Sequence, residues 1–333
     1  MMAYPSRWLS PLLLLLVLAL LSGALFYGES GISFVAGLRD LLDGRHSAAA
    51  TIVGTLRLPR ALLAVMVGGA LGCSGAALQG YLRNPLADPG ILGVSGGAAL
   101  GAVCVFYSGL SRFWVAFLPL GGLGGALVAV ALLVSLVGSG GALVLLLAGA
   151  ALSSLFAALT ALALNLAPSP YAMFEIAHWL MGSLTDRTFV DVAICLPGVV
   201  TGVALMASVG RALDALALGD EVAESMGFRL HGWWGVQNRL VLGAALAVGS
   251  CTAVSGAIGF VGLVVPHLLR PLTGYRPSRL LLPSFLGGAV MVLLADIVVR
   301  ALDHGVELQI GVLTAITGAP FFLYRVLMLR RVL

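Results

Sequence analysis

Few residues in this chain could do chemistry, and their pattern excludes most enzymes. All 18 basic residues are Arg, so the chain has no Lys with which a Walker A loop could hold nucleotide phosphates. No HExxH motif or paired carboxylates occur, and the four Cys lie singly inside apolar stretches. We therefore expect no catalytic residue, no metal site and no cofactor in this chain.

The densest polar run is Arg83-Asn84-Pro85-Leu86-Ala87-Asp88-Pro89-Gly90, which lies between two apolar segments. Pro85 and Pro89 lack a backbone N–H, and each disfavours helical geometry in the residue before it. Gly90 then lets the next helix start steeply. Taken alone, such a run is typical of an ordinary turn between helices.

A second polar stretch, residues 211–229, predicts two short amphipathic helices broken at Gly219. Asp220 and Glu221 suit the start of the second helix, where acidic residues complement the helix dipole, and Gly227 suits its end. Helices that lie on lipid usually carry a basic polar face, whereas this face is acidic. The stretch therefore predicts a contact with a partner protein rather than with the membrane surface.

Two further groups of residues stand at the ends of apolar segments. Arg57 and Arg60 flank a proline at a helix entry, and Arg300 ends another apolar segment one turn after Asp296. Such arginines are typical of anchors at lipid headgroups. His178 and Trp179 belong to an aromatic segment between apolar spans, where His178 could contact a substrate or ligate haem iron, although a packed or hydrogen-bonded histidine is the commoner case.

The composition predicts the elements that carry these residues. Apolar residues make up 60% of the chain and charged residues only 10%, so we expect an all-α polytopic membrane protein. About 20 mostly apolar residues are needed for each span. We expect about ten transmembrane helices in one permease domain over residues 1–333: 9–27, 61–80, 91–107, 113–137, 142–166, 190–209, 240–257, 258–269, 281–299 and 308–329. The span 258–269 is too short to cross without support from the protein around it.

An even number of spans places both termini on one side of the membrane. Arg7 at one end, with Arg330 and Arg331 at the other, predicts that this side is cytoplasmic, and residues 211–229 fall on it. Arg57, Arg60 and Arg300 fall outside and need another explanation. Because the arginines lie at helix ends, the basic net charge of +4 indicates membrane orientation and contact with membrane lipid, not nucleic acid.

The apolar segments contain almost no ionisable residues. Ion-coupled carriers usually need carboxylates or histidines inside the membrane, so an ion-coupled secondary transporter of a small solute is only the alternative reading. A weak internal repeat is consistent with transport, because Ser74-Gly75-Ala76 precedes Pro85 at the spacing at which Ser255-Gly256-Ala257 precedes Pro266. We therefore interpret the chain as a passive transport pathway, in which another protein supplies the energy for transport.

From Leu56 to the C-terminus, the chain resembles the FecCD/BtuC-like permeases, the membrane subunits of type II ABC importers for iron chelates, haem and vitamin B12. The resemblance is carried by the polar run at 83–90 with Gln79 before it, by Leu56-Arg57-Leu58-Pro59-Arg60 and by Leu218-Gly219-Asp220-Glu221 with Ala223 and Gly227. Further matches are 255–263, Pro266-His267-Leu268-Leu269-Arg270, 294–300, Glu307-Leu308-Gln309-Ile310-Gly311 and Gly318-Ala319-Pro320. Together and in this order, these motifs are highly specific.

The resemblance implies a homodimer of ten-helix subunits in the bacterial inner membrane, with both termini cytoplasmic. Two ABC ATPase subunits, which hold ATP and Mg, would bind below it, and one periplasmic or lipid-anchored substrate-binding protein above it. It also implies roles for particular residues. Leu218, Gly219, Asp220, Glu221, Ala223 and Gly227 would couple to the ATPase, and Arg57, Arg60 and Arg300 would dock the binding protein. Gln79, Asn84, Pro85, Leu86, Ala87, Pro89 and Gly90 would form the family's signature turn.

The substrate expected from this resemblance is a bulky metal chelate. No cluster of carboxylates, histidines or cysteines suits a naked metal ion. A ferric siderophore is the first expectation, because such systems are the most numerous in the family, and haem and cobalamin remain alternatives. His178 and Trp179 are the candidate substrate contacts.

Overall fold

The computed structural model describes residues 8–27, 33–110, 113–114, 116–138, 140–167, 169–302 and 308–330. Arg7, Glu307 and Arg331, on which predictions from the sequence rest, lie outside these residues. The described residues form helices, turns and loops, with no strand among them. The helices, in chain order, are α1 (Leu9–Phe26), α2 (Phe34–Leu42), α3 (Ala48–Thr51), η1 (Ile52–Arg57), α4 (Leu58–Tyr81), η2 (Pro89–Leu92), α5 (Val94–Ser108), α6 (Phe117–Val137), α7 (Ala142–Asn165), α8 (Pro170–Leu180), α9 (Phe189–Ser208), α10 (Gly210–Leu216), α11 (Asp220–Ser225), α12 (Val236–Ser255), α13 (Val261–Leu269), η4 (Pro271–Thr273), α14 (Pro277–Leu302) and α15 (Ile310–Arg330).

The ten apolar segments predicted from the sequence all form helices. Seven described helices, counting the continuous run Ala48–Tyr81 as one, are long and apolar enough to cross a membrane, and α5 and α15 contain shorter apolar helices. The tenth, α13, has only nine residues and packs against α4 and α14. The expected short, protein-backed helix is therefore present. Residues 258–260, which we expected at its start, precede the helix instead, because Phe260 adopts a left-handed conformation with φ of 66°.

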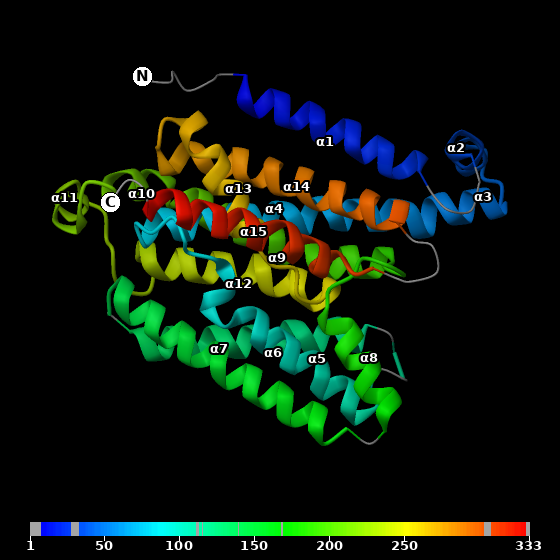
Figure 1. The fold of residues 1–333 in the computed structure, drawn as a ribbon, viewed down its shortest axis with the longest axis horizontal. Helices are drawn as coiled ribbons and strands as arrows, with labels where there is room; N and C mark the ends of the chain where they lie inside the picture. The colour runs from blue at the N-terminus through cyan, green and yellow to red at the C-terminus, as the bar shows by residue number, and fades with distance from the viewer. Residues whose placement is uncertain are drawn as a thin grey trace.

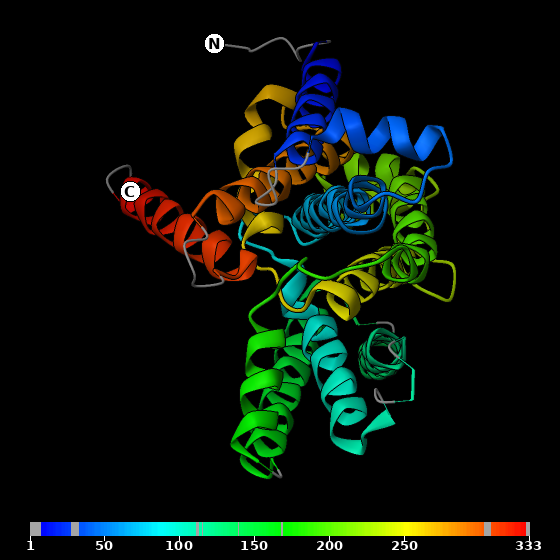
Figure 2. The ribbon, with the colours of Figure 1, turned by 90° about the vertical axis from the view of Figure 1, so that its right-hand side faces the viewer.

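Helix α4 lies near the middle of the bundle, with α14, α9 and α12 around it (Figure 2). It is also the most deeply buried of the long helices, since 20 of its 24 residues are buried. At the other extreme, α1 contacts the bundle mainly through α14 and leaves half of its leucines exposed. The exposed apolar faces of such outer helices are what a lipid environment requires.

Small residues set the distances between the most closely packed helices. Gly68 of α4 meets the backbone of Gly288 in α14, and Gly101 of α5 meets Gly121 in α6. Gly202 of α9 likewise meets the backbone of Gly243 in α12. In each pair an added Cβ would collide with a carbonyl oxygen of the facing helix. These crossings give a structural role to some of the chain's 44 glycines. Where the Cβ atoms are missing, the helix backbones approach closely and gain van der Waals contact.

The two ends of the bundle carry different short helices. The first turn of α1, the last turn of α15, α10 and α11 lie at one end, which we call the coupling end (Figure 1). Helices α2, α3 and α8 lie at the opposite, outer end (Figure 1). Helices α2 and α3 form between the first two predicted spans, where no helix was predicted, and each starts at a serine whose side chain accepts a backbone N–H.

The short sequence repeat takes different local structures in its two copies. Gly75 lies inside α4, where it touches the backbone of Gly262, whereas Gly256 is the C-cap of α12 with φ of 70°. Pro85 lies in a turn and Pro266 lies inside α13. The matched motifs are therefore not locally equivalent.

Candidate functional site

Gln79 joins the signature turn to α13. Its buried amide nitrogen Nε2 lies 3.3 Å from the Ala87 carbonyl oxygen and 3.2 Å from that of Gly262, and it donates to both. Its Oε1 accepts a hydrogen bond of 2.7 Å from Nη2 of Arg270. One side chain thus holds the turn, the start of α13 and the end of α13 together. The sequence placed Gln79 beside the turn, but gave no sign that Arg270 would be its partner.

Local hydrogen bonds fix the shape of the turn. The Asn84 side chain accepts the N–H of Leu86 at 2.9 Å, and the Asp88 carboxylate accepts the N–H of Gly90 at 2.8 Å. Desolvation raises the pKa of Asp88, and the hydrogen bond from Gly90 partly opposes that rise. Both contacts are short-range turns of the kind that Asn and Asp favour. Pro85, Leu86 and Pro89 complete a preformed connection, with Pro89 buried next to Gly262.

The two short helices predicted at 211–229 form as α10 and α11. Gly219 breaks them with φ of 122°, and Gly227 follows α11 with φ of 86°. Leu213 and Leu216 of α10 are buried, whereas Leu218 and Met226 are exposed. Asp220 and Glu221 are exposed as well, and Ala223 is buried. The pair thus presents apolar and acidic side chains together at the coupling end, as a protein-binding surface would.

Two polar contacts tie this pair of helices to the rest of the coupling end. Nη2 of Arg83 lies 2.8 Å from Oδ1 of Asp220, which connects the signature turn to α11. Asp214 accepts from both the backbone N–H and the hydroxyl of Ser278, at 2.9 and 2.6 Å, which connects α10 to the start of α14. The Arg83–Asp220 pair is largely exposed and adds little stability. Its position nevertheless brings two sequence-predicted sites into direct contact.

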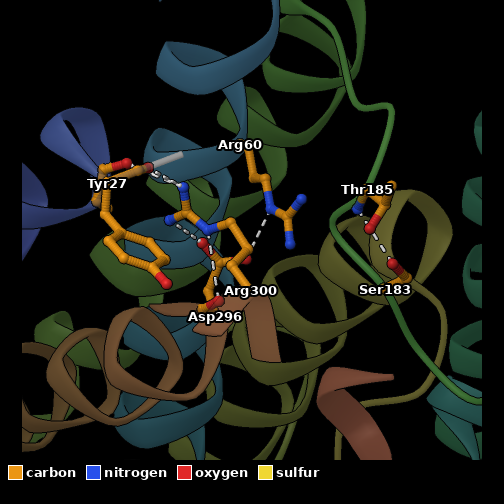
Figure 3. A network of polar contacts seen from close by, with 7 residues as sticks. Tyr27, Arg60, Ser183, Thr185, Asp296 and Arg300 are labelled. Atoms are coloured by element: carbon orange, nitrogen blue, oxygen red, sulfur yellow. Dashed lines mark hydrogen bonds and ion pairs between the residues drawn. The ribbon is translucent and has the colours of Figure 1, made fainter. Parts of the chain in front are cut away.

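At the outer end, Asp296 is shared by two arginines (Figure 3). Its carboxylate oxygens lie 2.7 Å from Nε of Arg60 and 2.6 Å from Nη2 of Arg300. The Asp296 side chain is completely buried, so the ion pairs are largely shielded from solvent. We call Arg57, Arg60, Asp296 and Arg300 the outer arginine cluster.

The same arginines anchor the end of α1. Nη1 of Arg300 donates to the carbonyl oxygens of Ala24 and Tyr27 at 2.9 and 3.0 Å, and Nη1 of Arg57 donates to that of Leu25 at 3.0 Å. These are carbonyls at the C-terminal end of a helix, which a cation stabilises. Arg57 and Arg300 retain only 6% and 7% of their surface exposed. Arg57 and Arg300 are therefore buried side chains that fasten the end of α1 to η1 and α14.

His178 and Trp179 line a cavity of about 650 Å³ at the outer end. The His178 ring stacks on Phe174, and its Nε2 lies 2.8 Å from the side-chain nitrogen of Gln309. The indole N–H of Trp179 is buried without a hydrogen-bond partner among the described residues. Burial lowers the pKa of Arg187 on the cavity wall, although the carboxylates of Asp191 and Asp186 act against this. No group of three His, Cys, Asp or Glu within the described ranges is arranged to hold a metal ion.

Comparison with known proteins decides the family. The model of the FecCD transport family matches residues 13–329. The chain belongs to the FecCD transport family. The cobalamin import system permease protein BtuC of Halobacterium salinarum is 39% identical over 91% of this chain and 80% of that protein. The vitamin B12 import system permease protein BtuC of Salmonella newport is 38% identical over 96% of this chain and 95% of that protein.

A solved structure supports the FecCD fold over the whole chain. It is of an ABC transporter assigned to the metal-chelate type, in an inward-facing conformation, and matches with a TM-score of 0.80 and 31% identity over 96% of this chain and 98% of that chain. The resemblance drawn from the motifs is thereby confirmed, as is the all-helical, BtuC-like architecture. As a member of the FecCD family, the chain is a multi-pass membrane permease of an ABC importer, a system that includes ATPase and substrate-binding partners.

Proposed function

We propose that this chain forms, as a homodimer in the bacterial cytoplasmic membrane, the pathway through which an ATP-driven importer moves a bulky metal chelate by alternating access. The observation that carries this proposal is the acidic, partly apolar surface of α10 and α11, which is joined through Arg83 and the signature turn to the helices of the bundle. A movement of this surface by an ATPase would be transmitted to α4 and α13. ATP and Mg would be held by that partner, and the chain itself would catalyse no reaction.

Cobalamin is the chelate that we propose first. Its support is that the permeases of Halobacterium salinarum and Salmonella newport described above carry that substrate in their names, at 39% and 38% identity. A ferric siderophore, our first expectation from the sequence, has no such support among these relatives, although the metal-chelate type of the solved structure is consistent with it. The cavity with His178 and Trp179 is the proposed contact for the substrate on the outer side.

In the orientation that import by an ATPase requires, both termini and the coupling end would lie in the cytoplasm. The outer arginine cluster would then face the side from which a substrate-binding protein arrives. Its described members carry three positive charges and one negative charge, and a homodimer would present two such clusters. We propose that this excess charge attracts acidic residues on the two lobes of the binding protein, through the field of the cluster more than through exposed side chains.

The buried carboxylates favour ATP-driven transport over ion coupling. Among the described residues, the buried acids are Asp191 and Asp296. Asp191 accepts from the N–H and hydroxyl of Thr188 at the start of α9, and Asp296 is paired with two arginines. Neither carboxylate is available to bind a coupling ion or proton, as a secondary transporter requires.

The energy source provides the test of the proposed function. In proteoliposomes with the cognate binding protein, we expect uptake of radiolabelled cobalamin to require both the ATPase and enclosed ATP, and to ignore proton and sodium gradients. The purified chain alone should hydrolyse no ATP above a mock preparation. Gradient-driven accumulation by the chain alone would refute the proposal. Uptake of a ferric siderophore but not of cobalamin would refute only the choice of chelate.

A charge reversal in α11 tests the coupling surface separately. Glu221 is exposed, so Glu221→Arg should fold normally while weakening the affinity of the dimer for the ATPase about tenfold, since a like or unmatched charge at an interface is costly. Asp43→Arg makes the same change at an exposed position between α2 and α3, at the outer end, and should leave that affinity unchanged. Equal affinities for both variants and the parent, measured by pull-down titration, would mean that α11 is not the coupling surface.

A further inference from the structure

A groove of about 700 Å³ opens on the side of the bundle between α6 and α12. Leu127 of α6 and Leu242 of α12 line it and are partly exposed, so the groove opens outward, where the hydrocarbon of a bilayer would lie. It is lined by Leu127, Val130, Ala131, Val134, Ser135, Trp233, Trp234, Asn238, Arg239 and Leu242.

The groove is apolar along its length and polar at one end. Helix α6 runs toward the coupling end and α12 runs away from it, so Ser135, Asn238 and Arg239 cluster near that end. Leu127, Val130, Ala131 and Leu242 line the part of the groove that lies farther from the coupling end. The distance from Leu127 to Ser135 along α6 is about 12 Å at the rise of an α-helix. This order of polar and apolar groups matches an amphiphile whose head lies at the membrane surface and whose chain points into the membrane.

Arg239 provides a positive charge at the polar end. Its Nη1 donates to the Ser208 hydroxyl at 3.3 Å, and its Nε is buried without a hydrogen-bond partner among the described residues. The groove lining includes no Asp or Glu that would neutralise it. A guanidinium in such a place binds phosphate oxygens well, because it offers several N–H donors in one plane.

Two tryptophans mark the level of the membrane surface at the same end. Trp233 and Trp234 are 79% and 70% exposed, although they stand in the short loop before α12. Tryptophan is enriched where hydrocarbon meets headgroups, since its ring is apolar and its N–H is polar. Their position next to Arg239 places the polar end of the groove at headgroup depth.

We propose that this groove binds an anionic glycerophospholipid of the leaflet on the coupling side, with its phosphate on Arg239 and one acyl chain between α6 and α12. Basic pockets between transmembrane helices on the cytoplasmic side are typical sites for anionic headgroups. The site is independent of the substrate and of the proposed function, and one of its two helices, α12, packs on α4.

Quenching by brominated lipids tests the site on the full-length protein in vesicles. With Trp8, Trp114 and Trp179 replaced by Phe, only Trp233 and Trp234 report. We expect dibrominated phosphatidylglycerol to quench at about one-fifth of the mole fraction that dibrominated phosphatidylcholine needs, the ratio expected for one cation near an anionic lipid. Arg239→Gln should abolish this preference, whereas Arg211→Gln, an exposed arginine of α10 that does not line the groove, should preserve it.

A second variant tests the acyl chain. Ala131 is exposed and lines the groove, so Ala131→Phe should fold and fill the space, which would reduce quenching by both lipids. Equal quenching by the two lipids in the parent, or a preference that survives Arg239→Gln, would overturn the anionic lipid. Absence of quenching by either lipid would show that a protein covers the groove, which would also overturn the proposal.

Discussion

Replacing Asp296 by Asn should destabilise the permease by about 3–5 kcal/mol, because it removes the charged partner of a buried ion-pair cluster. The substitution preserves the size of the side chain but leaves the guanidiniums of Arg60 and Arg300 without their shared carboxylate. Arg57 lies in the same cluster and adds to the repulsion between the arginines. The end of α1 should loosen first, since Arg57 and Arg300 hold its last carbonyl groups.

Thermal unfolding in detergent, followed by the fraction of protein that stays monodisperse, measures this effect. Asp43→Asn is the matched control, because Asp43 is exposed and makes only a weak ion pair of 3.7 Å with Arg45. The control should unfold with the parent. Replacing Asp296, Arg60 and Arg300 together by Leu, Met and Met should recover part of the loss, since an apolar set avoids the buried charges. If Asp296→Asn unfolds with the parent, the cluster does not hold the outer end together.

Local sequence signals predicted much of this architecture. Length and hydropathy located the ten apolar helices, and Pro and Gly located their breaks, because both act through the residues next to them. The break at Gly219 is an example: its φ of 122° is one that other residues rarely adopt. The signature turn was likewise predictable, since Asn84 and Asp88 bond to backbone groups two residues away.

Partners distant in sequence could not be predicted in the same way. Asp296 and Arg60 are 236 residues apart, and Gln79 and Arg270 are 191 apart, so no local pattern connects them. We predicted from the sequence that Arg57, Arg60 and Arg300 dock a binding protein, but not that Arg57 and Arg300 are buried. The only signal for the buried cluster was Asp296 one turn before Arg300 in an otherwise apolar segment, where an unpaired carboxylate would be costly.

The glycines of α4 lead to the second large effect, because they allow its contact with α14. Gly68→Leu should destabilise the protein by more than about 3 kcal/mol, the upper end of the usual cost of overpacking. A side chain at this position would collide with the backbone of Gly288 and Ala289, which cannot move as a flexible side chain can. The two helices would separate, although leucine has a high helix propensity and an apolar side chain.

Gly124→Leu provides the comparison within the same fold. Gly124 lies in α6 with nothing within 4 Å of the position that its Cβ would take, so the same substitution meets open space. It should leave the unfolding temperature unchanged or raise it, since Gly costs a helix roughly 0.8–1 kcal/mol relative to Ala. Helices α4 and α14 also carry Gln79 at one end and the outer arginine cluster at the other, so their separation should disturb both sites. If Gly68→Leu and Gly124→Leu unfold together, the contact between the two backbones is not what fixes the position of α4.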